Sequence, residues 1–159
     1  MSLPPFQTLL DAHGAAVYRF LAASVGPADA DDCFQEACIA ALRAYPRLRH
    51  VDNLRAWLMK IAQRKAIDAH RDRARRPQPL SQLPERHSTS DSDGSSRDGL
   101  GTVWAHVREL PEKQRMAVFL RSAADLSYAD VARTLDCSED AARRNVHEGL
   151  KRLREEMAA

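Results

Sequence analysis

The sequence predicts an all-α fold made of two small helical bundles joined by a flexible linker, with a helix-turn-helix in the second bundle. No alternating β-branched run typical of a strand occurs, whereas Ala, Leu, Arg and Glu dominate both halves at helical spacing. Residues 77–100 contain three prolines and many Ser, Asp and Gly residues, so they have little to bury. We therefore expect domains at 1–76 and 101–159, each of about four helices, with the linker between them.

Length and charge agree with two small domains in one chain. The 159 residues carry a formal net charge of +2, but 12 basic and 8 acidic side chains lie in 1–76, against 10 of each in 101–159. No stretch approaches the roughly 18 apolar residues of a membrane helix, and the N-terminus lacks a secretion signal. Three cysteines form no even disulfide framework. These features predict a cytoplasmic protein without membrane insertion.

Prolines divide the first half of the chain into three helical stretches. The first stretch ends at Gly26-Pro27, the second at Tyr45-Pro46 and the third at Pro77. Asp52 or Asn53 is suited to cap the third helix. The spacing of Leu9, Ala12, Ala16 and Phe20 fits one helix. In the next helix, the residues that we expect to face a core are Phe34, Cys38, Ile39 and Leu42.

The second helix also carries an acidic face that includes Asp31, Asp32, Gln35 and Glu36. An acidic face repels the phosphate backbone, so it does not favour DNA. The residues alone leave two interpretations open. The face is either a solvated surface or a docking surface for a basic partner.

The third helix has a basic face beside an apolar one. Lys60, Arg64, Arg71 and Arg75 lie within about 60° of one another on the helical wheel. The favourable interaction of cations with a helix C-terminus is confined to the last turn, so it does not explain Lys60 or Arg64. A basic stripe along one helix is typical of a surface that binds a phosphate backbone. The apolar face comprises Leu54, Trp57, Leu58 and Ile61.

The second half of the chain predicts a helix-turn-helix. After a helix from Val103 to Glu109, Leu110-Pro111 opens another helix. Ser127 and Ser138 are suited to cap two short helices, and a tight break separates these helices at Asp136-Cys137. Asp130 stands at the capping-box position after Ser127.

The last helix separates its apolar and basic side chains onto different faces. The apolar side consists of Ala142, Val146, Gly149, Leu150, Leu153 and Met157. The basic side consists of Arg143, Arg144, His147, Lys151 and Arg154. The basic side is either a solvated face or a surface for the DNA major groove, which an α-helix fits. The short turn and the small Ala141-Ala142 pair favour DNA, because bulky residues there would block close approach.

Five segments, in order along the chain, resemble one known family. They are Asp32-Cys33-Phe34-Gln35-Glu36, Arg55-Ala56-Trp57-Leu58 with Ile61-Ala62, Ala66-Ile67-Asp68, residues 110–115, and residues 127–154. Together they resemble the bacterial extracytoplasmic-function (group IV) sigma factors, small RNA polymerase subunits that select promoters. The chain departs from the family's usual pattern at Arg64, Ala141, Glu148 and Gly149.

The resemblance implies a role for each polar face and no catalytic residue, cofactor or metal. It implies core RNA polymerase binding by Asp32, Gln35 and Glu36. It implies minus-10 recognition, including the melted strand, by Lys60, Arg64, Arg71 and Arg75. It implies minus-35 recognition in double-stranded promoter DNA by Ser138, Arg143, Arg144, His147, Lys151 and Arg154. It also implies an anti-sigma factor as a partner, and closure of the two domains on each other would hide both basic faces.

Two alternatives of other classes stay open from the sequence. One is a DNA-binding regulator with similar domains that does not engage polymerase, although such a protein has no need of the acidic face. The other is a mimic that binds an anti-sigma factor, which needs no functional basic face. A thiol or metal sensor is disfavoured because Cys33 and Cys38 are five residues apart and diverge on a helix. No phosphate loop, metal cluster or nucleophile–base motif suggests an enzyme.

Overall fold

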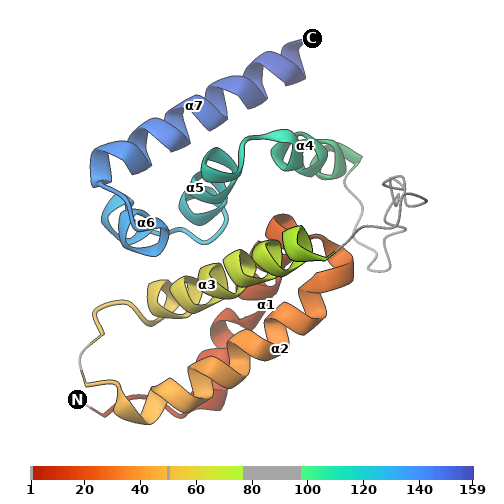
Figure 1. Ribbon diagram of the computed structural model, residues 1–159. Coiled ribbons are helices and arrows are strands. Elements are labelled where there is room, and N and C mark those ends of the chain that lie inside the picture. The colour runs from red at the N-terminus through yellow and green to blue at the C-terminus, as the bar shows by residue number, and fades with distance from the viewer. Residues whose placement is uncertain (1, 50, 77–97) are drawn as a thin grey trace.

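The computed structural model describes residues 2–49, 51–76 and 98–159, and these residues form two helical domains without strands (Figure 1). The predicted all-α fold is therefore confirmed. The first domain has three α-helices and one short 3-10 helix, and the second has four α-helices. The helices are α1 Phe6–Val25, α2 Pro27–Ala44, η1 Tyr45–Arg47, α3 Leu54–Arg75, α4 Asp98–Glu109, α5 Glu112–Ser122, α6 Tyr128–Leu135 and α7 Glu139–Ala158.

Most of the expected linker, residues 77–97, lies outside the described residues. Helix α4 begins at Asp98, three residues before the expected start of the second domain. Among the described helices, none combines the length and the apolar character that crossing a membrane requires.

Side-chain caps fix the start of three helices where the sequence predicts them. Asn53 Oδ1 accepts a hydrogen bond from the backbone N–H of Ala56 at 3.1 Å, so Asn53 rather than Asp52 caps α3. Ser127 Oγ accepts from the N–H of Asp130, and Ser138 Oγ accepts from the N–H of Ala141, each at 3.1 Å. Each oxygen satisfies a backbone donor that has no partner within its helix.

Asp136 turns the chain between α6 and α7. Its backbone is left-handed, with φ 51° and ψ 48°, a conformation that Asp tolerates better than most residues. Only Asp136, Cys137 and the cap Ser138 separate the two helices. This geometry confirms the predicted helix-turn-helix.

The buried face of α2 differs from the prediction. Ile39 and Leu42, which we expected to face a core, are 50% and 54% exposed, and Phe34 and Cys38 are only half-buried. Small side chains let α2 approach α1 and α3 closely, so the small-residue face is the one that packs. The buried residues of α2 are Ala30, Cys33, Ala37 and Ala41.

One hydrophobic core runs through both domains. Phe20 of α1 meets Phe119 of α5 edge to face, with ring centroids 5.7 Å apart. Met116 and Leu120 of the second domain belong to the same buried cluster as Leu58 of the first. Helix α3 lies beside α6, as Figure 1 shows. The two domains therefore close on each other in this structure.

Helix α7 packs closely on α5 at Gly149. A Cβ atom at this position would lie 2.6 Å from Val118 Cγ2, far inside van der Waals contact. The departure from the family's usual residue at Gly149 therefore has a packing reason. A smaller cluster of Val107, Leu110, Val118 and Leu153 completes the core of the second domain.

Candidate nucleic-acid interface

The basic face of α7 is open to solvent. Arg143, Arg144, His147, Lys151 and Arg154 are all exposed. The opposite side packs into the core, as predicted, except that Met157 is 59% exposed near the C-terminus. The buried residues of α7 are Ala142, Val146, Gly149 and Leu153.

The cations on α7 fall into two kinds. Arg143 is held: its Nη2 donates to Glu139 Oε1 at 2.8 Å, and this hydrogen bond is the main cause of a raised Arg143 pKa. Arg144, Lys151 and Arg154 make no side-chain hydrogen bond or ion pair with any residue in the described part of the chain. Long, solvated, unpaired cations of this kind suit phosphate contacts, whereas a fixed guanidinium suits a directional one.

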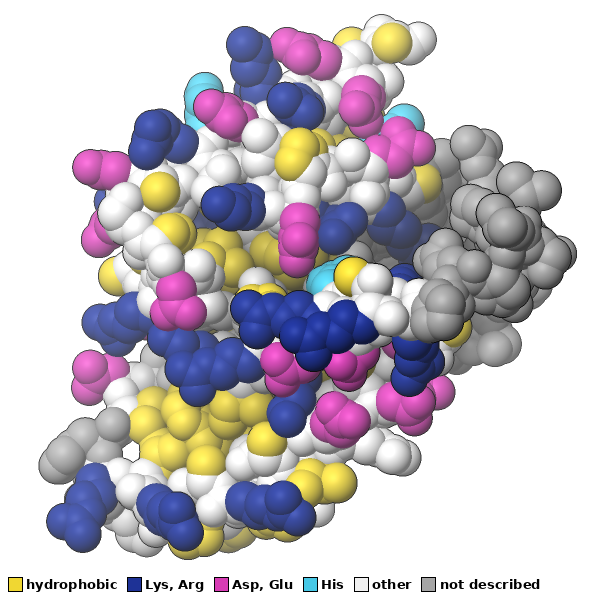
Figure 2. Space-filling model, viewed as in Figure 1, with side chains coloured by type: hydrophobic (Ala, Val, Ile, Leu, Met, Phe, Trp, Pro, Cys, Tyr) yellow, Lys and Arg dark blue, Asp and Glu magenta, His cyan; other side chains and the backbone are white. Residues whose placement is uncertain are grey.

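The basic residues of α3 also form one face, but its first member is engaged. Lys60 Nζ forms an ion pair with Asp136 Oδ1 at 3.0 Å, across the contact between the domains. Arg64, Arg71 and Arg75 are exposed. From Lys60 to Arg75 the stripe runs for roughly 22 Å along the helix axis, which is long enough to contact several phosphates of a nucleic acid. Figure 2 shows Lys and Arg side chains gathered in a band across the middle of one face of the molecule.

The expectation that domain closure would hide both basic faces is wrong. Apart from Lys60, which is half-buried, the predicted cations of both helices stay exposed in the closed arrangement. These cations stay exposed because the second domain contacts α3 through α6 and through the turn that follows α6. Helix α7 therefore keeps its basic face toward solvent.

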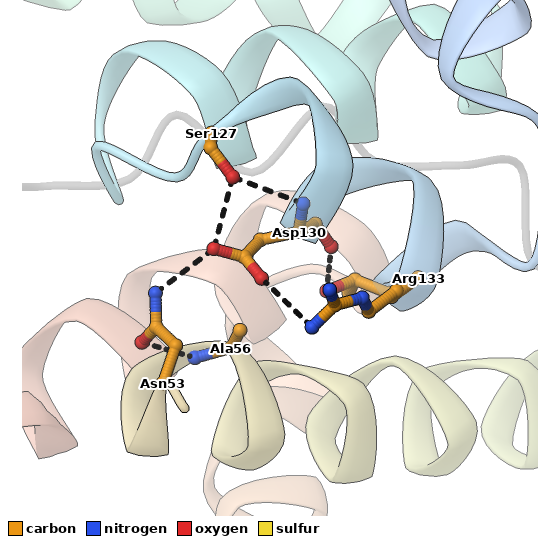
Figure 3. A network of polar contacts seen from close by, with 6 residues as sticks. Asn53, Ala56, Ser127, Asp130 and Arg133 are labelled. Atoms are coloured by element: carbon orange, nitrogen blue, oxygen red, sulfur yellow. Dashed lines mark hydrogen bonds and ion pairs between the residues drawn. The ribbon is translucent and has the colours of Figure 1, made fainter. Parts of the chain in front are cut away.

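The start of α3 is tied to α6 by a polar network (Figure 3). Asn53 caps α3 through its Oδ1 atom and donates from Nδ2 to Asp130 Oδ2 at 3.0 Å. Ser127 Oγ donates to the same Asp130 oxygen at 3.0 Å, and Arg133 lies 3.6 Å from the other oxygen. Asp130, placed by the sequence in a capping box, therefore also joins the two domains.

A second polar link between the domains involves Arg55. Its Nη1 donates to the carbonyl oxygen of Ala124 at 2.6 Å, and its Nε donates to His13 Nδ1 at 3.4 Å. Burial, followed by the charge of Arg55, lowers the pKa of His13. A lowered pKa keeps the imidazole neutral, which lets Nδ1 accept the hydrogen bond.

Two cavities lie along the contact between the domains. One of about 260 Å³ is lined by Asn53, Trp57 and Lys60 of the first domain and by Asp130 of the second. The other, of about 360 Å³, lies between α3, α5 and the turn before α7. Trp57 packs beside Tyr45, with ring centroids 6.1 Å apart, so its ring is partly used in the core.

The acidic face of α2 is solvent-exposed at all three predicted docking residues, Asp32, Gln35 and Glu36. The misassigned Ile39 and Leu42 continue this surface along α2. It is therefore a mixed acidic and apolar face, which the charge pattern alone does not reveal. The informative pattern was the small-residue stripe of α2, which leaves the larger apolar side chains for the surface.

Among the described residues, Cys33 and Cys38 are poorly suited to reaction, and His106, Glu109 and Glu156 bring metal-binding types of side chain together. Burial raises the pKa of Cys33 and Cys38, which disfavours the reactive thiolate. The donor atoms of His106, Glu109 and Glu156 lie within 4.8 Å of one another. Among them, His106 Nδ1 and Glu156 Oε2 are 3.4 Å apart and form an ion pair when the histidine is protonated.

Comparisons with known proteins cover both domains. Residues 9–76 match the family model Sigma-70 region 2, and residues 101–153 match Sigma-70, region 4. The ECF RNA polymerase sigma factor SigD of Mycobacterium tuberculosis is 34% identical over 153 residues, which cover 90% of this chain and 72% of SigD. The ECF RNA polymerase sigma factor SigX of Bacillus subtilis is 26% identical over 96% of this chain and 83% of SigX.

Two solved structures have the same fold. The sigma factor RpoE of Bartonella quintana, in complex with the anti-sigma factor NepR, superposes with a TM-score of 0.80 at 22% identity, over 99% of each chain. CnrH, in complex with the cytosolic domain of CnrY, superposes with a TM-score of 0.70 at 20% identity, over 96% of this chain and 87% of CnrH. Both likenesses extend over the two domains of this chain.

Proposed function

Because this chain belongs to the extracytoplasmic-function family of RNA polymerase sigma factors, which act in transcription initiation, we propose that α2 binds core RNA polymerase while α3 and α7 bind promoter DNA. This division of roles among the helices rests on the separation of charge on the surface. The exposed face of α2 is acidic and apolar, whereas the exposed faces of α3 and α7 are basic. A polyanion such as DNA is attracted to a basic surface and repelled by an acidic one.

In this proposal α7 enters the major groove of the minus-35 element. Its exposed Arg144, Lys151 and Arg154 neutralise phosphates, and the fixed Arg143 reaches a base edge. Ser138, which caps α7, and His147 are also exposed. Ser138 Oγ accepts from the backbone N–H of Ala141, and its O–H stays available to donate to a phosphate oxygen.

The basic stripe of α3 binds the minus-10 region. Arg64, Arg71 and Arg75 are available in the closed arrangement, whereas Lys60 becomes available when its ion pair with Asp136 breaks. Separation of the domains would release that ion pair and open the cavity beside Trp57. Binding of the melted strand is therefore coupled to opening of the contact between α3 and α6.

An anti-sigma factor is the proposed regulatory partner, and the cytoplasm is the proposed site of action. RpoE and CnrH, which share the fold across both domains, were each solved with a protein partner. The closed arrangement leaves the α2 face and both basic faces exposed to a protein that wraps around the two domains. A sigma factor acts where RNA polymerase and the chromosome are, which places this chain in the cytoplasm.

The test is co-elution of the full chain with bacterial core RNA polymerase on a sizing column. Asp32→Asn/Glu36→Gln should weaken co-elution, and so should Gln35→Ala alone. Asp72→Asn/Glu155→Gln removes the same number of negative charges at exposed positions outside α2, so it should co-elute normally. Equal behaviour of the two double variants would overturn the assignment of the α2 face.

A further inference from the structure

Tyr128, the first residue of α6, lies under two guanidinium groups. The Cζ atom of Arg143 is 4.6 Å from the centre of the Tyr128 ring, and the Cζ atom of Arg121 is 4.9 Å from it. Both distances are within the range of a favourable cation–π interaction. Arg121 is also fixed by a hydrogen bond from its Nη1 to the carbonyl oxygen of Leu126 at 3.1 Å. Tyr128 therefore connects the end of α5 with the second turn of α7.

Arg143 has two restraints that the other α7 cations lack. Tyr128 supports the plane of its guanidinium, and Glu139 accepts a hydrogen bond from Nη2. A free arginine side chain samples many rotamers, and part of this rotamer entropy is lost whenever the side chain forms a fixed contact. A guanidinium that is already fixed loses less when it binds a partner, so its geometry favours a directional contact.

The hydrogen bond to Glu139 leaves most of the Arg143 donors unused. A guanidinium has five N–H donors, and the structure assigns Nη2 to one acceptor. The side chain stays 56% exposed, at the N-terminal end of the helix that enters the groove in a helix-turn-helix. Bidentate donation to O6 and N7 of guanine is the commonest specific arginine contact in the major groove.

We propose that Tyr128 is a positioning residue that presents Arg143 to a guanine edge, so that Arg143 determines sequence preference while Arg144, Lys151 and Arg154 supply affinity that does not depend on sequence. This inference rests on the proposed binding of α7 to duplex promoter DNA. It assigns different roles to neighbouring arginines that the helical wheel treats alike. It also assigns a role in specificity to a residue outside the recognition helix.

The probe is a duplex that the full native chain selects from a randomised pool, compared with a scrambled duplex of the same composition. Tyr128→Leu should lower affinity for the selected duplex about 3-fold, because Arg143 is then no longer held in place before it binds. Affinity for the scrambled duplex should not change. Tyr128→Phe, which keeps the ring, should behave as the native chain. Tyr18→Leu is the control, because it removes an aromatic ring that lies in α1, outside the helix-turn-helix.

A double-mutant cycle separates positioning from a merely structural role. Arg143→Ala should lower affinity for the selected duplex by about 10-fold or more, and adding Tyr128→Leu should change it no further. Additive effects, or equal losses on both duplexes, would overturn the role of Tyr128. If Tyr128→Leu unfolds, Tyr128→Met keeps the volume without the ring and takes its place. If the native chain selects no duplex, the proposed minus-35 recognition fails together with this inference, whereas normal selection by Tyr128→Leu overturns only the inference.

Discussion

Helices α3 and α7 both have one basic face, yet among the described residues the other domain engages cations of α3 and none of α7. Lys60 is paired with Asp136, and the Asn53 cap of the same helix is bonded to Asp130. On α7 the restraints on Arg143 come from within its own domain, through Glu139 and Tyr128. A basic stripe in a sequence therefore indicates where DNA could bind, whereas tertiary contacts decide which cations are free to bind it.

Under the proposed DNA binding, the two faces also have different structural requirements. The α7 face is already exposed, so duplex binding there needs no rearrangement of the domains. Full use of the α3 face requires Asp130 and Asp136 to separate from it. The two carboxylates accept hydrogen bonds from polar side chains of the first domain. When DNA binds, phosphate oxygens would have to take the place of these carboxylates as acceptors. The following variants test this difference, in order of decreasing expected effect.

The largest effect is expected from the aromatic contact that joins the domains. Phe119→Ala removes a buried ring from the shared core and should lower the free energy of unfolding by about 3–5 kcal/mol. Because Phe119 meets Phe20 of the other domain, the variant should also show a larger radius of gyration by small-angle X-ray scattering. Leu153→Ala, in the separate cluster of the second domain, should lose stability without domain separation. If both variants stay equally compact, the shared core does not hold the domains together.

A smaller effect is expected where α7 is anchored to α5. Gly149→Ala would place a methyl group against the stiff Val118 side chain, and overpacking of this kind costs about 1–3 kcal/mol. The better helix propensity of Ala offsets up to about 1 kcal/mol of that cost. We expect a net loss near 1 kcal/mol by urea denaturation. In a Val118→Ala background, which supplies space, Gly149→Ala should become neutral or stabilising, and an unchanged loss in that background would contradict the steric explanation.

Local sequence chemistry predicted the helices and their caps well, because those features depend on residues within one turn of each other. Asn53, Ser127 and Ser138 cap helices through contacts three residues along the chain. The helical wheel also separated the basic and buried sides of α7, since this amphipathic helix of 20 residues has one core to face.

Contacts between distant residues were not predictable in the same way. Helix α2 has two apolar stripes, and the choice between them depended on how closely α1 and α3 approach. The pairing of Lys60 with Asp136 joins positions 76 residues apart, and no local spacing relates them. The contact of Tyr128 with Arg143 could not be predicted either, because it depends on the angle between α6 and α7.

A modest effect is expected when the ion pair on α3 is removed. Asp136→Asn keeps a residue that tolerates the left-handed turn while releasing Lys60. An exposed pair contributes at most about 1 kcal/mol, so binding of a fluorescent 20-nucleotide oligo-dT should strengthen about 2-fold in an anisotropy titration. Asp125→Asn is the matched control, because Asp125 is also exposed and left-handed, with φ 54°. In a Lys60→Gln background the Asp136→Asn effect should fall to that of the control, and a persistent difference would count against release of Lys60.

The smallest effect concerns the pH dependence of the link through His13. Burial and Arg55 hold the folded-state pKa of His13 below its ordinary value of 6.5, so the unfolded chain takes up this proton first as the pH falls. The stabilising contribution of neutral His13 is complete above pH 6.5 and is lost as the pH falls from there toward the folded-state pKa. His13→Asn keeps a neutral acceptor near the Nδ1 position without titrating. Urea denaturation from pH 7.5 to 5.5 should show a steeper loss of stability in the native chain than in this variant, by less than about 1 kcal/mol because the site is only half-buried. Parallel pH profiles would contradict a lowered His13 pKa in the folded protein.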